Sequence, residues 1–200
     1  MRCQTGAGDR TVNRGPVSTH SGNPHVSSGS PSFRTQVVPD DVERVRHLVT
    51  DTRFFHDHEV EIAVELVEET LLKGVSAGYH FLLADDGPRL VAYACFGPIP
   101  CTTSSFDLYW IAVAPTAQRF GWGRRLMSAM EQRVRELNGT QVFIDTSGRD
   151  QYSPTRSFYE RCGYKLVARL HDFYAPNDDK LIYARSLVEL EPVAGSLGRV

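Results

Sequence analysis

The stretch Gln118–Arg125, QRFGWGRR, stands between a run of aromatic and β-branched residues and a long amphipathic segment. Gly121 and Gly123 lie one residue apart in it, with arginines on either side. The first N–H groups of a helix have no intrahelical acceptor and carry a partial positive charge, so they attract anions. Glycine lets the backbone approach an anion closely and adopt positive φ. The stretch is therefore built like a phosphate-binding loop.

Two well-known phosphate-binding patterns do not match this loop. A dinucleotide fingerprint needs a third glycine where Leu126 stands, and the chain has no G-x-x-x-x-G-K-[ST] run. Taken alone, the two glycines also fit an ordinary strand-to-helix turn with solvated arginines.

The residues on both sides of the loop predict regular elements in the order β-α-α-β-β-β-α-β-α-β-β. The expected helices lie around residues 42–49, 58–73, 124–137 and 154–162. The expected strands are residues 33–38, 79–84, 90–96, 106–113, 141–145, 165–170 and 180–187. A loop over residues 171–179 is expected to join the last two strands. This order predicts a mixed α/β layer rather than a doubly wound sheet.

Length and composition predict one domain with a tail at each end. Residues 1–32 are rich in Ser, Gly, Thr, Pro and Asn, so we expect them to be disordered. We expect residues 33–190 to form the domain and residues 191–200 a C-terminal tail.

The composition also limits the kinds of partner that we expect. A net charge of −2 argues against a nucleic-acid binder. The apolar runs are too short to span a membrane, and no secretory signal is visible. The four cysteines lack CxxC pairing and the spacing of a zinc site. We therefore expect a cytoplasmic protein with reduced thiols, no metal and no membrane contact.

Two motifs resemble those of one enzyme family. The run IAVAPTAQRFGWGRRLM resembles the acyl-CoA-binding motif [QR]-x-x-G-x-[GA] of the GNAT superfamily of N-acetyltransferases, with Gln118, Gly121 and Gly123 at its defining positions. The run SFYERCGYKLVARL resembles a second motif of that family, and the likeness extends from Phe33 to Leu187. It implies a single α/β (α+β) domain, with a central mixed, mostly antiparallel sheet, helices on its faces and splayed central strands.

The resemblance also implies a co-substrate, acetyl-CoA. The pantetheine arm would lie between splayed strands and pair with backbone groups of Ile111 and Val113. The Ile111 N–H would donate to the thioester carbonyl, and the loop would hold the pyrophosphate. The implied cofactor-binding residues are Ile111, Ala112, Val113, Gln118, Arg119, Phe120, Gly121, Trp122, Gly123 and Arg124. No metal is implied.

Two residues are candidates for proton transfer. Tyr159 occupies the position of the tyrosine that the family uses to protonate the leaving thiolate; it also fits a core aromatic residue with a bonded hydroxyl. Asp107 opens the pantetheine strand, where related enzymes place a base, although aspartate is disfavoured in strands. It also fits a solvated strand end, and a chain of waters could replace it. Tyr152 stands where the family usually has an asparagine that contacts the cofactor.

Carboxylates gather in the segments that border the acceptor site in this family. They lie on the first two helices and in the loop 171–179, where Asp172 and Tyr174 are the predicted substrate-binding residues. Such a cluster would attract a cationic amine. The His-Asp-His run at residues 56–58 has no third ligand and reads as a solvated helix start.

Three functions remain in competition at this point. The first is an N-acetyltransferase that moves the acetyl group from acetyl-CoA to a primary amine by direct attack in a ternary complex. The amine would be a small cationic amine, an amino acid or a peptide N-terminus. The second is a non-catalytic sensor that binds acyl-CoA, and the third is an unrelated nucleotide-binding protein with a similar loop. The resemblance alone also suggests a homodimer.

Overall fold

The computed structural model describes residues 33–188. The two predicted tails, residues 1–32 and 191–200, lie outside the described residues. The predicted element order is confirmed from the first helix onward. The helices are α1 (Asp41–Asp51), α2 (Asp57–Lys73), α3 (Trp122–Glu136) and α4 (Ser153–Arg161). The strands are β1 (His80–Asp86), β2 (Arg89–Pro98), β3 (Ser105–Val113), β4 (Gln141–Ser147), β5 (Lys165–Ala175) and β6 (Asp178–Ser186).

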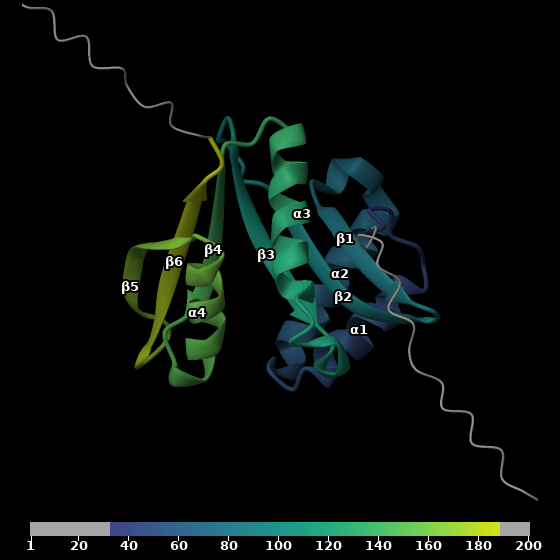
Figure 1. Ribbon diagram of the computed structural model, residues 1–200, viewed down its shortest axis with the longest axis horizontal. Coiled ribbons are helices and arrows are strands. Elements are labelled where there is room, and N and C mark those ends of the chain that lie inside the picture. Colours follow the sequence, from purple (N-terminus) through teal and green to yellow (C-terminus); the bar gives the residue numbers. More distant parts are fainter. Residues whose placement is uncertain (1–32, 189–200) are drawn as a thin grey trace, which may run out of the picture. The chain divides into compact units, whose positions relative to one another are not determined.

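The strands form one six-stranded sheet in the order β1-β2-β3-β4-β6-β5. All neighbouring pairs are antiparallel except β3 and β4, which run parallel. The parallel pair lies at the centre of the sheet, and the two strands separate along their length (Figure 1). The predicted mixed, mostly antiparallel sheet with splayed central strands is therefore confirmed.

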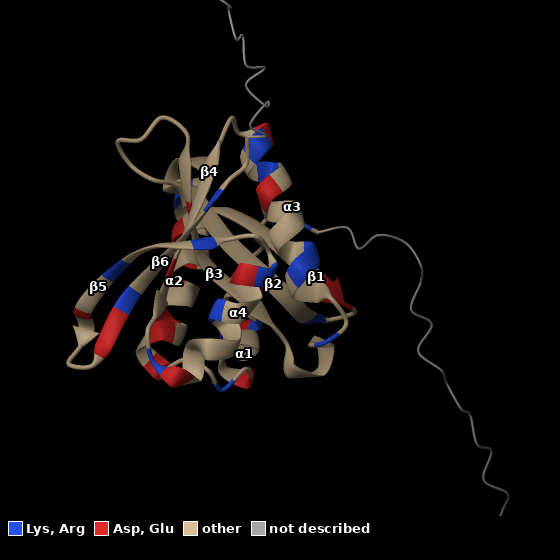
Figure 2. Cartoon of the chain, turned by 60° about the vertical axis from the view of Figure 1, so that its left-hand side comes forward, with Lys and Arg blue, Asp and Glu red and all other residues tan. Residues whose placement is uncertain are grey.

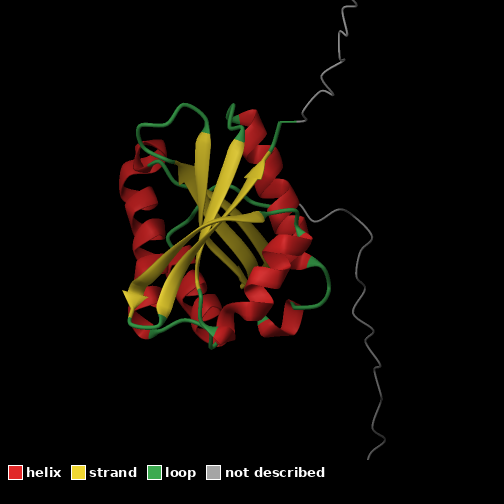
Figure 3. Cartoon of the chain, turned by 90° about the vertical axis from the view of Figure 1, so that its left-hand side faces the viewer, coloured by secondary structure: helices red, strands yellow, loops and turns green. Residues whose placement is uncertain are grey.

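Helices cover both faces of this sheet (Figure 3). On one face, α1 and α2 pack against β1 to β3 through a core that includes Val45, Val67 and Tyr93. On the other face, α3 and α4 enclose a second core with Leu126, Met130 and residues of β1 to β4 and β6. Apolar side chains of the helices supply much of both cores, because their spacing places them on one side of each helix.

The strand predicted over residues 33–38 is wrong, because only Arg34 pairs with the sheet, in a single bridge to Leu83. The chain then turns into α1, where the Val38 N–H donates to the Asp41 carboxylate at 2.8 Å. The Arg34 guanidinium donates to the same buried carboxylate at 2.7 Å and to Asp85 at 3.1 Å. These side-chain contacts fix the segment in place of a β ladder.

Candidate functional site

The site begins where β3 and β4 part. Their parallel pairing ends at Asp107 and Phe143. Beyond this fork lies a cavity of about 910 Å³, lined by residues 107–113 of β3, residues 144–147 of β4 and the start of α4. Ligand pockets of drug-sized molecules span roughly 300–1,000 Å³, so the cavity can hold a long, thin ligand together with a small one.

The backbone of β3 is unpaired on the side that faces this cavity. The Ala114 N–H donates to the Val91 carbonyl at 2.8 Å, which marks that pair as hydrogen-bonded. Since antiparallel pairs alternate, Ala112 also bonds to β2 while Ile111 and Val113 turn their N–H and C=O groups away from it. They point into the fork, where β4 no longer supplies partners. This edge offers hydrogen bonds to the amides of an extended ligand.

The glycine loop stands at one end of that free edge. The Gln118 side-chain amide donates to the Val113 carbonyl at 3.2 Å, which ties the loop to the strand. Arg119 and Gly121 both adopt left-handed backbone conformations, with φ of 66° and 82°. Gly121 precedes the first turn of α3 and offers no side-chain cap, so the first N–H groups of the helix stay open to a ligand.

Positive charge surrounds this helix start. Arg119, Arg124 and Arg125 are exposed, and none of the ion pairs among residues 33–188 involves them. Basic segments are visible at both ends of α3 in Figure 2. Free N–H groups, a helix N-terminus and free arginines together fit the pyrophosphate of a coenzyme.

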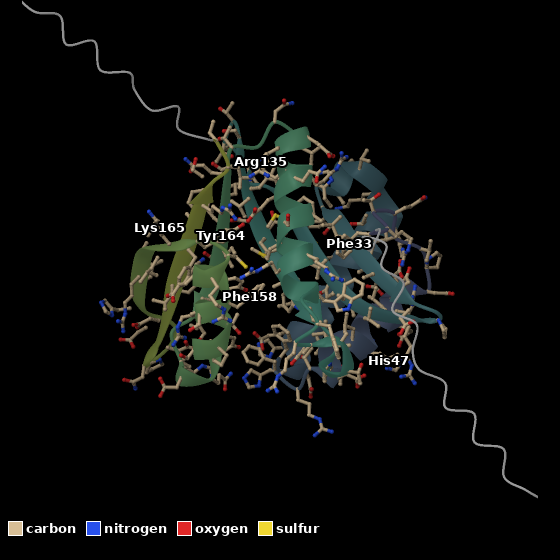
Figure 4. The ribbon with its side chains drawn as sticks, viewed as in Figure 1. Phe33, His47, Arg135, Phe158, Tyr164 and Lys165 are labelled. Carbon is tan, nitrogen blue, oxygen red and sulfur yellow. The ribbon has the colours of Figure 1, made fainter. Side chains whose placement is uncertain are left out.

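Gly123 has a different role from Gly121. A Cβ atom on Gly123 would lie 3.1 Å from the ring of Phe158, so a side chain there would press on α4. Phe158 lies between α4 and α3 (Figure 4). The second glycine of the loop therefore allows the two helices that border the cavity to pack closely.

Asp107 is the last residue of β3 that pairs with β4, and its side chain lines the cavity. Phe106 and Leu108 lie in the core under α3, so by alternation Asp107 points to the opposite face, on the side of α2. Burial, followed by the nearby Asp145 carboxylate, raises the pKa of Asp107 to about 6, against the effect of Lys180. A carboxylate with this pKa is ionised at neutral pH and can still accept a proton readily.

Tyr159 reaches the same cavity from the other face of the sheet. It lies on α4, is 5% exposed and belongs to the core under α3 and α4. Burial raises the pKa of its hydroxyl, so the group stays protonated at neutral pH. The cavity therefore runs through the sheet at the fork, with a proton acceptor on one side and a proton donor on the other.

The prediction of a loop over residues 171–179 is wrong. Strand β5 continues to Ala175, and β6 begins at Asp178 after a short turn. The pairing register shifts between Leu170 and Ala175, so a bulge interrupts the ladder where the loop was expected. The polar residues that suggested a loop stabilise this bulge by bonding to its backbone.

Those polar residues differ in their relation to the cavity. Tyr174 and Asp178 line it, whereas Asp172 does not. The Asp172 carboxylate accepts the Asn177 N–H at 2.6 Å, and the Asp172 N–H donates to Asp179 at 2.9 Å. That N–H, followed by the Arg169 guanidinium, holds the pKa of Asp179 below its ordinary value. We therefore leave Asp172 out of the proposed acceptor site and keep Tyr174.

Sequence reasoning missed several residues that line the cavity. Phe54 and Phe55 come from the connection between α1 and α2, and Asp145 comes from β4. Glu59, at the start of α2, also lines the cavity and is one of the carboxylates predicted on the first two helices. Asp145 could have been found, because it is an aspartate in a strand, the same signal that identified Asp107. The contribution of the helix connection carried no such signal. Within residues 33–188, no cluster of His, Cys, Asp and Glu could hold a metal ion.

A family model described as the Acetyltransferase (GNAT) domain matches residues 77–166. A solved structure from Desulfovibrio desulfuricans, assigned to the GNAT family of acetyltransferases, is 46% identical, covers 78% of this chain and 98% of its own, and superposes with a TM-score of 0.77. A search of curated proteins finds no significant match.

More distant structures share the fold alone. An aminoglycoside 6'-N-acetyltransferase solved with coenzyme A is 19% identical over 78% of this chain and 95% of its own, with a TM-score of 0.61. The ribosomal-protein-S18-alanine N-acetyltransferase of Escherichia coli is 16% identical over 84% of this chain and 98% of its own, with a TM-score of 0.62. The two proteins act on unrelated acceptors, so the fold by itself does not name one.

Proposed function

The chain belongs to the GNAT family of acetyltransferases, and from this premise we propose that it transfers the acetyl group of acetyl-CoA to a primary amine by direct attack in a ternary complex. The observation that carries the proposal is the fork. A free strand edge, a proton acceptor and a proton donor meet there in one cavity that passes through the sheet.

The described residues fit acetyl-CoA as the co-substrate. The open N–H groups at the start of α3 and the arginines around them would hold the pyrophosphate. The free edge of β3 at Ile111 and Val113 would pair with the pantetheine amides. When bound, acetyl-CoA would supply the acetyl group as a thioester.

Three protein groups then have separate roles in acyl transfer. Ionised Asp107 accepts a proton from the acceptor ammonium, because only the neutral amine is nucleophilic. The Ile111 N–H donates to the carbonyl oxygen, where negative charge develops during attack. Tyr159, which stays protonated, gives its proton to the leaving sulfur. The sheet and its helices hold the three groups on separate elements around one cavity.

The experiment is thiol release from acetyl-CoA by the purified protein with a panel of amines. We expect release that depends on one class of amine. Tyr159→Phe should lower kcat by about 100-fold, the usual contribution of a positioned acid, and leave CoA affinity unchanged. Tyr164→Phe is the matched control, because Tyr164, labelled in Figure 4, is a buried tyrosine of the same core. It does not line the cavity.

Two outcomes would contradict the proposal. CoA binding without release for any amine would favour a non-catalytic acyl-CoA sensor. Equal kcat values for Tyr159→Phe and the unmodified protein would remove Tyr159 from the mechanism.

A further inference from the structure

A continuous row of aromatic rings lines the cavity on the side of Asp107. The ring centroids of Tyr152 and Phe54 are 4.7 Å apart, those of Phe54 and Phe55 are 5.6 Å apart, and those of Phe55 and Trp110 are 5.2 Å apart. All four residues line the cavity. They come from the start of α4, the connection between α1 and α2, and β3. We call this row the aromatic wall.

The aromatic wall is only partly covered by the protein. Phe54, Phe55 and Trp110 are partly exposed, although each carries a large apolar surface. Arg53, which precedes them, adopts a left-handed backbone conformation with φ of 53°. Such strain in a non-glycine residue persists only where the surrounding structure enforces it. A strained turn thus presents two phenylalanines to the cavity, where a flat apolar ligand would gain by covering them.

The charges in the cavity limit how many positive groups the acceptor can bring. Four carboxylates line it, from Glu59, Asp107, Asp145 and Asp178. Two of them already have basic partners, since Asp145 pairs with Lys180 and Asp178 pairs with Arg149 at 2.9 Å.

The remaining two carboxylates have no Lys or Arg partner within residues 33–188. Glu59 accepts the His56 backbone N–H at 2.8 Å, and Asp107 stands at the fork. A polycation with three or more ammonium groups would leave at least one of them without a counter-charge inside a partly desolvated cavity. An ammonium beside Asp107 pairs with the free carboxylate at the fork, while Glu59 already accepts the His56 N–H at the start of α2.

We propose that the acceptor is a small arylalkylamine, a primary amine joined by a short alkyl chain to an aromatic ring. This rests on the proposed function and specifies its acceptor. The ring lies against the aromatic wall, and the amine lies at the fork beside Asp107. Tyr174, from the β5–β6 hairpin, lines the cavity as well and adds a further aromatic surface.

The transfer is balanced in atoms and protons. The C–N bond forms between the amine nitrogen and the acetyl carbon, and the C–S bond breaks. The ammonium nitrogen loses two protons in all. One leaves to solvent through Asp107, and the other replaces the proton that Tyr159 gives to sulfur. The products are the N-acetylated arylalkylamine and free CoA thiol.

The test compares kcat/KM for tryptamine with that for n-butylamine, spermidine, kanamycin and an alanine-starting tripeptide, using the full chain and thiol release. We expect tryptamine to exceed each of the others by at least about tenfold. Phe55→Leu, which keeps apolar volume but loses the ring, should lower the ratio of kcat/KM for tryptamine to kcat/KM for n-butylamine by about tenfold. Phe173→Leu is the control, because Phe173 is an exposed aromatic residue outside the cavity.

The outcomes separate this proposal from the proposed function. Faster transfer to spermidine, kanamycin or the tripeptide overturns the arylalkylamine and leaves the acetyltransferase intact. Equal kcat/KM values for tryptamine and n-butylamine would show that the aromatic wall does not bind the acceptor. This comparison uses the unmodified protein, so it does not depend on whether a variant folds. Absence of thiol release with every amine overturns both.

Discussion

At the scale of single residues, the position and the proton affinity of Asp107 depend on its neighbours in the sheet. It is the last residue of β3 to pair with β4, so its backbone is held while its side chain enters the cavity. Phe143 of β4 is the pairing partner of Asp107. Asp145 follows Phe143 by two positions, so it lies on the same face of the sheet as Asp107. Asp145 is itself paired with Lys180. The proton affinity of Asp107 therefore depends on a pair of residues that need not touch the acceptor.

This dependence predicts a pH profile. In the proposed mechanism transfer requires ionised Asp107, whose pKa is about 6, so kcat/KM should rise with pH through that value and level off above pH 7. Asp145→Asn removes a charge that raises the pKa of Asp107, so the rise should move to lower pH. Lys180→Met removes a charge that lowers it, so the rise should move to higher pH.

The profile is measured by thiol release between pH 5 and pH 9. Asp107→Asn should lose about 100-fold in kcat/KM at pH 7.5. Asp86→Asn is the control, because Asp86 is exposed at the far end of β1 and does not line the cavity. A normal rate for Asp107→Asn would show that waters carry the proton instead. An unmoved rise in Asp145→Asn would show that the two carboxylates do not interact.

At the scale of elements, the loop before α3 is shaped by backbone conformation rather than by side-chain contacts. Nothing lies within 4 Å of a Cβ atom built on Gly121, so only its left-handed φ requires glycine there. Arg119 adopts a similar φ without being glycine. The loop is therefore held in a conformation that most residues avoid, and it keeps the start of α3 open.

Gly121→Ala tests this element. Alanine in the left-handed region costs about 1–2 kcal/mol, so the free loop should relax and must be forced back when a pyrophosphate binds. That energy corresponds to a rise in the Kd for CoA of about tenfold, measured by calorimetric titration. Gly87→Ala is the matched control. Gly87 also has positive φ and open space, but it lies in the β1–β2 turn, so this change should lower Tm and leave CoA affinity unchanged. Unchanged affinity in Gly121→Ala would mean that the loop conformation does not matter for CoA.

At the scale of the whole described domain, the fork divides the sheet into two halves that need other connections. The short parallel pairing of β3 and β4 joins them at one end. On the face of α3, Arg185 of β6 donates to Glu131 of α3 at 2.8 Å and to the carbonyl of Cys162, beyond α4, at 2.7 Å. Glu131 is 5% exposed. This ion pair links the helix that packs on β1 to β3 with the other half of the sheet.

Arg185→Met should therefore destabilise the protein strongly. It leaves the buried Glu131 carboxylate without a partner, which typically costs 3–5 kcal/mol; we expect about 3 kcal/mol, because Arg185 is partly exposed. Urea unfolding measures the loss. The double variant Glu131→Leu with Arg185→Met should recover most of it, since no charge then stays buried. A loss below about 1 kcal/mol in the single variant would show that the pair is dispensable.

None of the helices in residues 33–188 is long and apolar enough to span a membrane.

The sequence prediction of fold and family was confirmed, and its failures share one cause. Residues 33–38 and 171–179 were assigned from their residue pattern, whereas specific hydrogen bonds of polar side chains decided both. Arg34 is held by Asp41 and Asp85, and the bulge in β5 is held by Asp179. Such side-chain hydrogen bonds leave no periodic signal in either segment.

The sequence by itself determined the glycine loop, the positions of the helices and the two motifs, because helix starts, turns and amphipathic faces depend on residues close together in the chain. Only the tertiary structure decided that the cavity passes through the sheet, that Asp107 and Tyr159 enter it from opposite faces, and that Asp145 and Asp178 are already paired. It also assembled the aromatic wall from residues 54, 55, 110 and 152. The reason is physical: burial, pairing and proton affinity depend on neighbours in space, and those neighbours come from segments far apart in the chain.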